Sequence, residues 1–245
     1  MSAIYETDKL LAEYLLFHFG NAEEILPPDR AWPEGMTAAL DFAVRTAEHF
    51  SANDVERGLD LGCAVGRSTF EMARRCGEVV GIDFSHAFIQ AAETLRSGTS
   101  LGYGRCEEAA QVTSLEACLP LNLRRGNTHF LQGDAMNLPL DLGVFDRVHA
   151  ANLLCRLPEP ERLLERLASL VKAGGELVLA TPCTWLAEFT PPQNWPEAGT
   201  LEWLKTKLAP AFSLTRQTDE PFLIRETARK FQWTTSLVTV WRRHS

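Results

Sequence analysis

A glycine-rich turn between an apolar run and a helical stretch carries the clearest chemistry in this chain. The turn, residues 62–66, starts and ends with glycine and follows the run Leu59-Asp-Leu61. Glycine permits a sharp turn and a close approach of a ligand to the backbone, and the N–H groups that open the next helix face that ligand. Asp83 ends the next apolar run, where a carboxylate can accept hydrogen bonds from two ribose hydroxyls. The layout predicts a nucleoside-binding site.

The residue types around this turn bear on which nucleoside it binds. A dinucleotide site of the G-x-G-x-x-G type needs a second glycine close to the pyrophosphate, but Ala64 occupies that position. Asp60 lies two residues before Gly62, where a carboxylate repels a pyrophosphate and suits a ligand with an ammonium group. We therefore expect S-adenosylmethionine as the cofactor, with S-adenosylhomocysteine as its product. A nicotinamide-dependent oxidoreductase is the less favoured alternative.

Composition narrows the class of protein further. The chain has 245 residues, 45% of them hydrophobic, which is enough for the core of one α/β domain. Its net charge of -8 argues against a nucleic-acid partner. The amino-terminal residues lack the pattern of a signal peptide, and no apolar run approaches the roughly 20 residues of a membrane span. We expect a cytoplasmic protein, and its six scattered cysteines lack metal-ligand spacing, so we expect no metal.

Apolar periodicity predicts strands that alternate with helices, which indicates a parallel, doubly wound α/β sheet. The expected helices cover 5–19, 37–50, 67–76, 85–96 and 158–171. The expected strands cover 58–61, 78–82, 128–132, 144–150 and 176–180, with two late strands near 213–218 and 234–241. The whole chain, 1–245, is expected to form one domain, with residues 1–57 as a helical lid. Residues 97–126 form an insertion before the third strand, with a short hairpin and a helix at 113–119.

Five segments, taken in order, resemble the class I S-adenosylmethionine-dependent methyltransferases. They are residues 59–66, 79–85, 132–139, 145–154 and 172–182. The resemblance implies a Rossmann-like sheet of seven strands, mostly parallel with a late antiparallel strand. It also implies that Asp83 binds the ribose, that Asp134 and the Ala135 N–H lie near the adenine, and that Asn152 lines the methionine portion. The remaining expected cofactor-binding residues are Asp60, Gly62, Cys63, Ala64, Gly66, Arg67, Ser68 and Phe84.

A narrower resemblance covers nearly the whole chain. Residues 5–20, 184–191, 194–195 and 222–233, together with the insertion, look like the 4-mercaptohistidine (5-thiohistidine) N-methyltransferases of ovothiol biosynthesis. Membership of that family implies methyl transfer to a ring nitrogen of 5-thiohistidine, which gives ovothiol A. A methyltransferase for another small-molecule acceptor remains the alternative.

Sheet topology selects the residues that can meet an amino-acid substrate. In an open α/β sheet ligands bind at the carboxyl ends of the strands, so loops 151–158, 181–200 and 219–233 belong to the active side. The substrate carboxylate favours a guanidinium, and we expect Arg225 or Arg229, with Arg156 as a further candidate. The expected aromatic walls of the substrate site are Tyr5, Tyr14, Trp185 and Trp195.

Methyl transfer from a sulfonium needs alignment and exclusion of water more than covalent help. A thiolate is a better nucleophile than an imidazole nitrogen, so an N-methyltransferase must hold the sulfur away from the methyl group. We expect Arg156, Asn152 or a backbone N–H to do this, and Tyr5, Glu6 or His18 to take a proton if a base is needed. The insertion residues Tyr103, Arg105 and Glu107 are expected to lie away from the chemistry. We assign the insertion to packing or to contact between copies of the chain.

Overall fold

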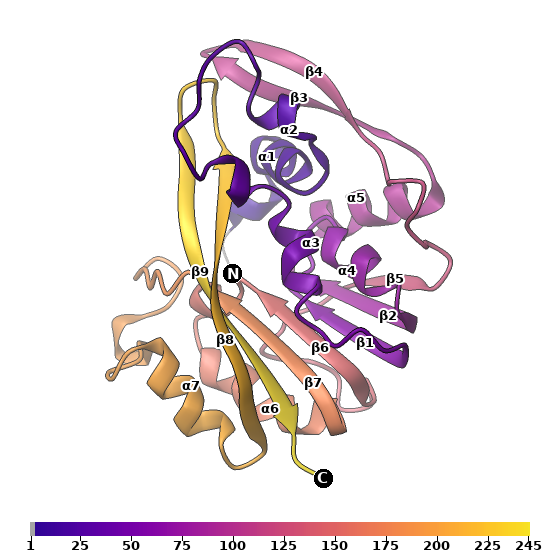
Figure 1. The fold of residues 1–245 in the computed structure, drawn as a ribbon, viewed down its shortest axis with the longest axis vertical. Helices are drawn as coiled ribbons and strands as arrows, with labels where there is room; N and C mark the ends of the chain where they lie inside the picture. Colours follow the sequence, from indigo (N-terminus) through magenta and orange to yellow (C-terminus); the bar gives the residue numbers. More distant parts are fainter. Residues whose placement is uncertain (1–2) are drawn as a thin grey trace.

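The fold is built on one twisted sheet of seven strands, and a computed structural model describes residues 3–245 (Figure 1). The spatial order is β5-β2-β1-β6-β7-β9-β8. These strands are β1 Val55–Leu61, β2 Cys76–Asp83, β5 Thr128–Gln132, β6 Phe145–Ala151, β7 Val171–Thr181, β8 Phe212–Arg225 and β9 Phe231–Arg243. The pairs among β5, β2, β1, β6 and β7 are parallel, and β9 runs antiparallel to both of its neighbours. The expected sheet, with its late antiparallel strand, is confirmed.

Helices cover both faces of this sheet, as a doubly wound fold requires. The helices are α1 Asp8–Phe19, α2 Ala22–Ile25, α3 Phe42–Ala47, α4 Arg67–Met72, α5 His86–Ser97, α6 Pro160–Leu170 and α7 Thr200–Leu208. Short 3-10 turns are η1 Ala3–Glu6, η2 Thr37–Ala39, η3 Leu154–Arg156 and η4 Pro192–Asn194. Helices α6 and α7 pack on one face, whereas α3, α4 and α5 pack on the other. Helix α7 was not among the expected elements.

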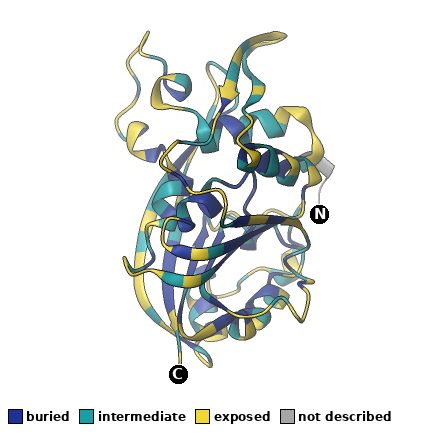
Figure 2. Ribbon diagram, turned by 90° about the vertical axis from the view of Figure 1, so that its right-hand side faces the viewer, coloured by how far each residue is buried: buried dark blue, intermediate teal, exposed yellow. Residues whose placement is uncertain are grey.

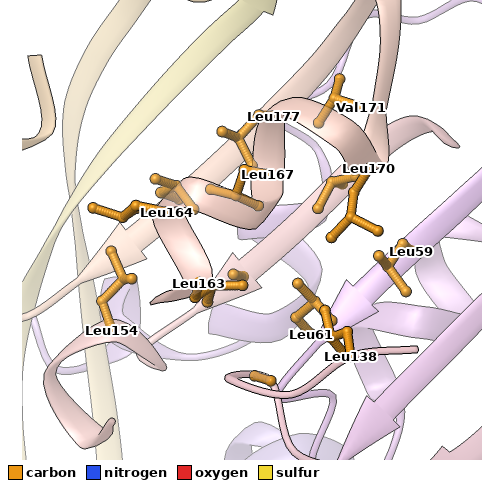
Figure 3. Close-up of a cluster of buried hydrophobic side chains, with 14 of the residues drawn as sticks. Leu59, Leu61, Leu138, Leu154, Leu163, Leu164, Leu167, Leu170, Val171 and Leu177 are labelled. Carbon is orange, nitrogen blue, oxygen red and sulfur yellow. The ribbon is translucent and has the colours of Figure 1, made fainter. Parts of the chain in front are cut away.

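The largest core cluster lies between the sheet and α6. Leucines at helical spacing on α6 interlock with the inward side chains of β1, β6 and β7 (Figure 3). These side chains include Leu59, Leu61, Leu163, Leu167 and Leu177. Because alternate residues of a strand point to opposite faces, Asp60 and His149 face away from this cluster, toward α3 and α4. The same alternation sends other strand residues, such as Val79 and Val178, to a second apolar cluster on the face of α3 and α4.

The insertion is a β-hairpin, and one part of the sequence expectation for it is wrong. Strands β3 (Leu101–Glu108) and β4 (Gln111–Ala117) pair antiparallel as a separate two-stranded sheet. The helix expected at 113–119 is absent, because the partly buried residues of β4 recur at every second position, which is a strand period. The hairpin also packs against α1 and the upper part of β8, and so lies on the lid side of the molecule. Self-association through this segment stays a prediction.

The amino-terminal helices form a roof over the carboxyl ends of the parallel strands (Figure 1). The helix expected at 37–50 is broken into η2 and α3, because Asp41 adopts a left-handed backbone with φ of 57°. Above the sheet, β8 and β9 continue as a long hairpin beside this roof. Burial follows the sheet and the base of the roof, while the outer loops are exposed (Figure 2). Among the described residues, none of the helices has the length and apolar character needed to cross a membrane.

Candidate active site

A cavity of about 120 Å³ lies between the carboxyl edge of the sheet and the roof. Its floor comes from the loops after β1, β2, β5 and β6, and its walls come from η1, α1 and α3. The roof contributes mainly aromatic side chains, including Tyr5, Tyr14, Phe17 and Phe42. The floor contributes Asp83, Asn152 and Arg156 among its polar groups. The site is thus an apolar chamber with a few polar groups at defined positions, which is typical of a small-molecule site.

The glycine turn forms one side of this cavity through an unusual backbone. Gly62 has φ of 70°, and Ala64 has φ of 47°, so even a residue with a side chain adopts the left-handed region here. Gly66 has φ of 91° and lies under the ring of Phe130, where an added Cβ would come within 2.7 Å of Cζ. Gly62 and Ala64 line the cavity, so the backbone itself borders the ligand space. The requirement for glycine inferred from the sequence is therefore both conformational and steric.

Asp83 presents a partly buried carboxylate to the cavity, and two backbone groups fix its orientation. The Ala64 N–H donates to Oδ2 and the Ser85 N–H donates to Oδ1, each at 2.9 Å. Burial raises the pKa of Asp83 to about 6, although these N–H groups oppose the rise. Both oxygens retain acceptor capacity, so an ionised Asp83 can accept hydrogen bonds from a diol. This geometry fits the ribose-binding role expected from the sequence.

Asp60 lies beneath the cavity and does not line it. It is only 1% exposed, and its Oδ1 lies 2.8 Å from Nδ1 of His149. The hydroxyls of Ser68 and Thr69 both donate to its Oδ2 at 2.7 Å. Burial alone would raise the pKa of Asp60, but His149 and the two hydroxyls hold it below its usual value. The structure differs here from the expectation of direct contact with a cationic ligand, because protein donors already use both carboxylate oxygens.

Comparison with known proteins identifies this arrangement. A family model described as a methyltransferase domain matches residues 59–179, about half of the chain. A demethylmenaquinone methyltransferase of Lactiplantibacillus plantarum is 28% identical over 189 residues, which cover 75% of this chain and 67% of that protein. A phosphatidylethanolamine N-methyltransferase of Cereibacter sphaeroides is 31% identical over 55% of this chain and 54% of that protein. This chain belongs to the class I S-adenosylmethionine-dependent methyltransferases. It spans between 39% and 67% of the length of such curated relatives.

Solved structures agree on the fold of this methyltransferase. The N-methyltransferase NodS of Bradyrhizobium japonicum, in complex with S-adenosylhomocysteine, superposes with a TM-score of 0.55 at 16% identity, over 96% of this chain and 99% of that one. The [4+2]-cyclase SpnF gives a TM-score of 0.60 at 17% identity, over 98% and 94% of the two chains. At such low identity these likenesses show the architecture alone. The reaction has to be argued from the site.

The residues of this methyltransferase fit an S-adenosylmethionine molecule. Asp83, a partly buried acceptor for a diol, lies beside the glycine turn, in which Gly62 and Ala64 have left-handed backbone and line the cavity. Phe84 and Ala135 line the cavity next to it, where an adenine ring requires a flat apolar surface and a backbone N–H. Asn152 lines the opposite side, and its carbonyl oxygen accepts from the Ser236 hydroxyl at 2.7 Å, which leaves its amide group as a donor. Among residues 3–245, no group of three or more His, Cys, Asp or Glu side chains is placed to hold a metal ion.

The structure brings the three expected catalytic residues together. Tyr5, Asn152 and Arg156 all line the cavity, and Arg156 is its one Lys or Arg among the described residues. Burial raises the pKa of the Tyr5 hydroxyl, which the neighbouring Arg156 guanidinium opposes through its charge and a hydrogen bond. Arg156 also donates to the Thr184 carbonyl at 3.3 Å and lies over the Phe189 ring at 4.7 Å. Tyr14 lines the same cavity, and burial raises its pKa as well.

Four expected substrate residues do not reach the cavity. Arg225 belongs to strand β8 rather than to a loop, is 4% exposed, and pairs with Glu107 of the insertion at 2.7 Å. Arg229 is exposed in the turn between β8 and β9. The Trp185 indole donates to Thr200 and packs edge-on against Trp203. The Trp195 indole, 37% exposed, donates to the Thr190 carbonyl.

Several expected cofactor residues support the site from outside the cavity. Cys63 is buried in the core, and Arg67 pairs with Glu71 and donates to the His18 carbonyl. Asp134 accepts from the Met136 N–H at 2.9 Å and so shapes the turn that presents Ala135. Glu6, a candidate base, instead accepts from the first N–H groups of α5. Tyr103, Arg105 and Glu107 do not line the cavity, as expected.

Sequence reasoning missed the polar side chain at the base of the cavity, His149. It lies on β6 directly beside Asp60 on β1, because these two residues are register partners. A histidine between apolar residues in the second half of a predicted strand was the available signal, and its partner could be found only from the strand order. His18, a candidate base, also lines the cavity, but burial lowers its pKa to about 3. It is therefore neutral at physiological pH.

Proposed function

We propose that this methyltransferase transfers the methyl group of S-adenosylmethionine to an imidazole ring nitrogen of 5-thiohistidine, giving ovothiol A. The sequence likeness to thiohistidine N-methyltransferases, which includes residues 5–20, suggests the acceptor. The observation that carries the proposal is the meeting of Tyr5, from that segment, with Arg156 at the cavity. Arg156 is the one Lys or Arg side chain of the cavity among the described residues, and in this proposal it lies beside the bound cofactor.

The lining of the cavity suits a small ring with charged substituents. Tyr14, Phe17 and Phe42 offer aromatic walls to an imidazole. The Arg156 guanidinium can hold an anion, either a carboxylate or a thiolate. Arg225 and Arg229 do not line the cavity, and we infer that Arg156, the arginine that does, holds the thiolate.

The cofactor supplies an electrophilic methyl group on a sulfonium. The acceptor nitrogen forms the new N–C bond as the S–C bond breaks, and one proton of the thiohistidine leaves to solvent. Alignment of such reactants contributes on the order of 7–11 kcal/mol when it is good. The roof residues Tyr5, Tyr14 and Phe17 exclude water and hold the acceptor against the floor. Because burial raises the pKa of Tyr5, its hydroxyl acts as a donor at neutral pH rather than as a base.

Selectivity for nitrogen requires that the sulfur be held away from the methyl group. Arg156 and the Asn152 amide are the donors that can engage the thiolate from the floor. Their location on the loop after β6 separates them from the aromatic walls on α1 and α3. In this proposal the ring nitrogen faces the methyl group while the sulfur faces the loop.

The test is incubation of the purified protein with S-adenosylmethionine and 5-thiohistidine, followed by mass spectrometry and NMR of the product. We expect one methyl group on a ring nitrogen. Arg156→Met should raise the KM for thiohistidine about tenfold or more and release some S-methyl product, because a charged hydrogen bond is lost. Arg162→Met, on exposed α6 surface outside the cavity, is the matched control. Absence of product, or S-methylation unaffected by Arg156, contradicts the proposal.

A quinol-type acceptor is the second candidate, because the relatives include demethylmenaquinone and ubiquinone biosynthesis methyltransferases. The largely aromatic roof would also accept such a ring. Incubation with a short-chain demethylmenaquinol distinguishes the two. Turnover of the quinol without turnover of thiohistidine would replace the first proposal with this one.

A further inference from the structure

Two buried ring nitrogens at the cavity have no hydrogen-bond partner within the part of the chain that the structure describes. They are Nε2 of His149 and Nδ1 of His18. Both side chains line the cavity. A buried polar atom without a partner costs about 1–3 kcal/mol, so it normally meets a ligand or a water molecule. The cavity thus contains one unsatisfied polar atom at its base, on β6, and one in its wall, on α1.

The surroundings of His149 define what its free nitrogen can do. Asp60 is held ionised by its partners, so the proton of a neutral His149 ring lies on Nδ1, 2.8 Å from the carboxylate. Nε2 is then an acceptor, and the negative charge of Asp60 lies directly behind it. Ser68 and Thr69 hold the other carboxylate oxygen, which fixes the orientation of the pair. His149 therefore presents to the cavity an acceptor nitrogen whose negative potential is strengthened by the buried Asp60 carboxylate.

We propose that His149 Nε2, oriented by Asp60, accepts a hydrogen bond from the α-ammonium group of an amino acid bound in the cavity. An ammonium carries only donors, so it complements an acceptor that is backed by a negative charge. His149 lies on β6, two residues before the strand ends at Ala151. Asn152, which also lines the cavity, follows Ala151 in the chain. The sequence analysis expected an ammonium group to contact Asp60. Because Asp60 does not line the cavity and its partner His149 does, we assign this contact to His149.

Two molecules could supply this ammonium group. One is the methionine end of the cofactor, and the other is the amino-acid acceptor of the proposed function. The second source rests on that function, whereas the first requires only that the chain bind S-adenosylhomocysteine. Calorimetry with S-adenosylhomocysteine and with 5′-methylthioadenosine, which lacks the amino-acid end, isolates the first source. The KM values of 5-thiohistidine and of its desamino analogue isolate the second.

The variant His149→Asn should weaken S-adenosylhomocysteine binding about 10- to 100-fold and leave 5′-methylthioadenosine binding within twofold, if the cofactor supplies the group. Asp60→Asn keeps the imidazole but removes the charge, and should give a smaller loss of the same selectivity. If the acceptor supplies the group, the KM for 5-thiohistidine should rise about 10- to 100-fold while that for its desamino analogue stays constant.

The matched control is His49→Asn, because His49 also contacts a carboxylate, Glu220, at 2.9 Å but lies outside the cavity. It should change none of these constants. Equal weakening of both nucleosides by His149→Asn would show a merely structural role and overturn the proposal. Unchanged values in both arms would overturn it as well. If His149→Asn selectively weakens S-adenosylhomocysteine binding but the wild-type protein does not methylate thiohistidine, the proposed function fails and this inference stands.

Discussion

Replacing Arg225 by methionine separates a structural role from a substrate-binding role. The guanidinium is buried and donates to Glu107 at 2.7 Å and to the Ile25 carbonyl at 3.1 Å. It therefore joins β8, the insertion hairpin and the end of α2. Breaking a buried ion pair costs about 3–5 kcal/mol. Glu107 retains Arg105 and Thr113 as partners and is partly exposed, so we expect a lower cost, about 2–3 kcal/mol.

This cost is measurable by urea or thermal unfolding. For a chain of this size, about 2–3 kcal/mol corresponds to a decrease in Tm of about 4–12 °C. The exposed Arg229→Met is the matched control, with an expected change below about 0.5 kcal/mol. At a temperature where Arg225→Met remains folded, its KM for the methyl acceptor should equal that of the wild type. A normal Tm combined with a raised KM would refute this reasoning and restore Arg225 as a carboxylate-binding residue.

Two further predictions concern the cofactor end of the site. Because burial raises the pKa of Asp83 to about 6 and only the carboxylate form accepts from both ribose hydroxyls, S-adenosylhomocysteine affinity should fall about tenfold from pH 7 to pH 5. Calorimetry on Asp83→Asn should show weaker binding without this pH step, and an unchanged step would assign the titration to another group. Gly66→Ala should destabilise the fold by about 3 kcal/mol, because it combines left-handed strain with a contact of 2.7 Å to the Phe130 ring. Gly174→Ala, with φ of 71° and open space around it, should cost only about 1 kcal/mol in urea unfolding, and similar losses in both variants would count against the steric argument.

The sequence predicts the central architecture well because local signals and global packing agree there. The helix expected at 85–96 appears as α5, with the Ser85 hydroxyl accepting from the Phe88 N–H as its cap. Strands β1, β2, β6 and β7 carry runs of consecutive buried residues, which require a sheet covered on both faces. The glycine turn could be predicted because Gly62 and Gly66 adopt left-handed backbone, which glycine favours.

Prediction failed where distant contacts decide the structure. The apolar run at 222–224 extends β8 to Arg225, so a residue expected on an active-side loop became part of a buried ion pair. Strand β4 depends on packing against α1 and on pairing with β3, which its composition alone does not reveal. The His149–Asp60 pair requires the strand order, since these residues are far apart in the chain but adjacent across β1 and β6.

The length of β8 and β9 determines how ligands can reach the chamber. Their ladder continues unbroken at the upper end, from the pairs beside β7 to Arg225 opposite Phe231. Its upper part carries Leu223 and Ile224, which contact the roof and the cavity. Because the roof packs against the continuous strand β8, a rigid-body opening of the roof would have to break these contacts. Ligand exchange then requires local release of the η1 segment at Tyr5, whose carbonyl accepts from the Ser85 hydroxyl at 2.9 Å.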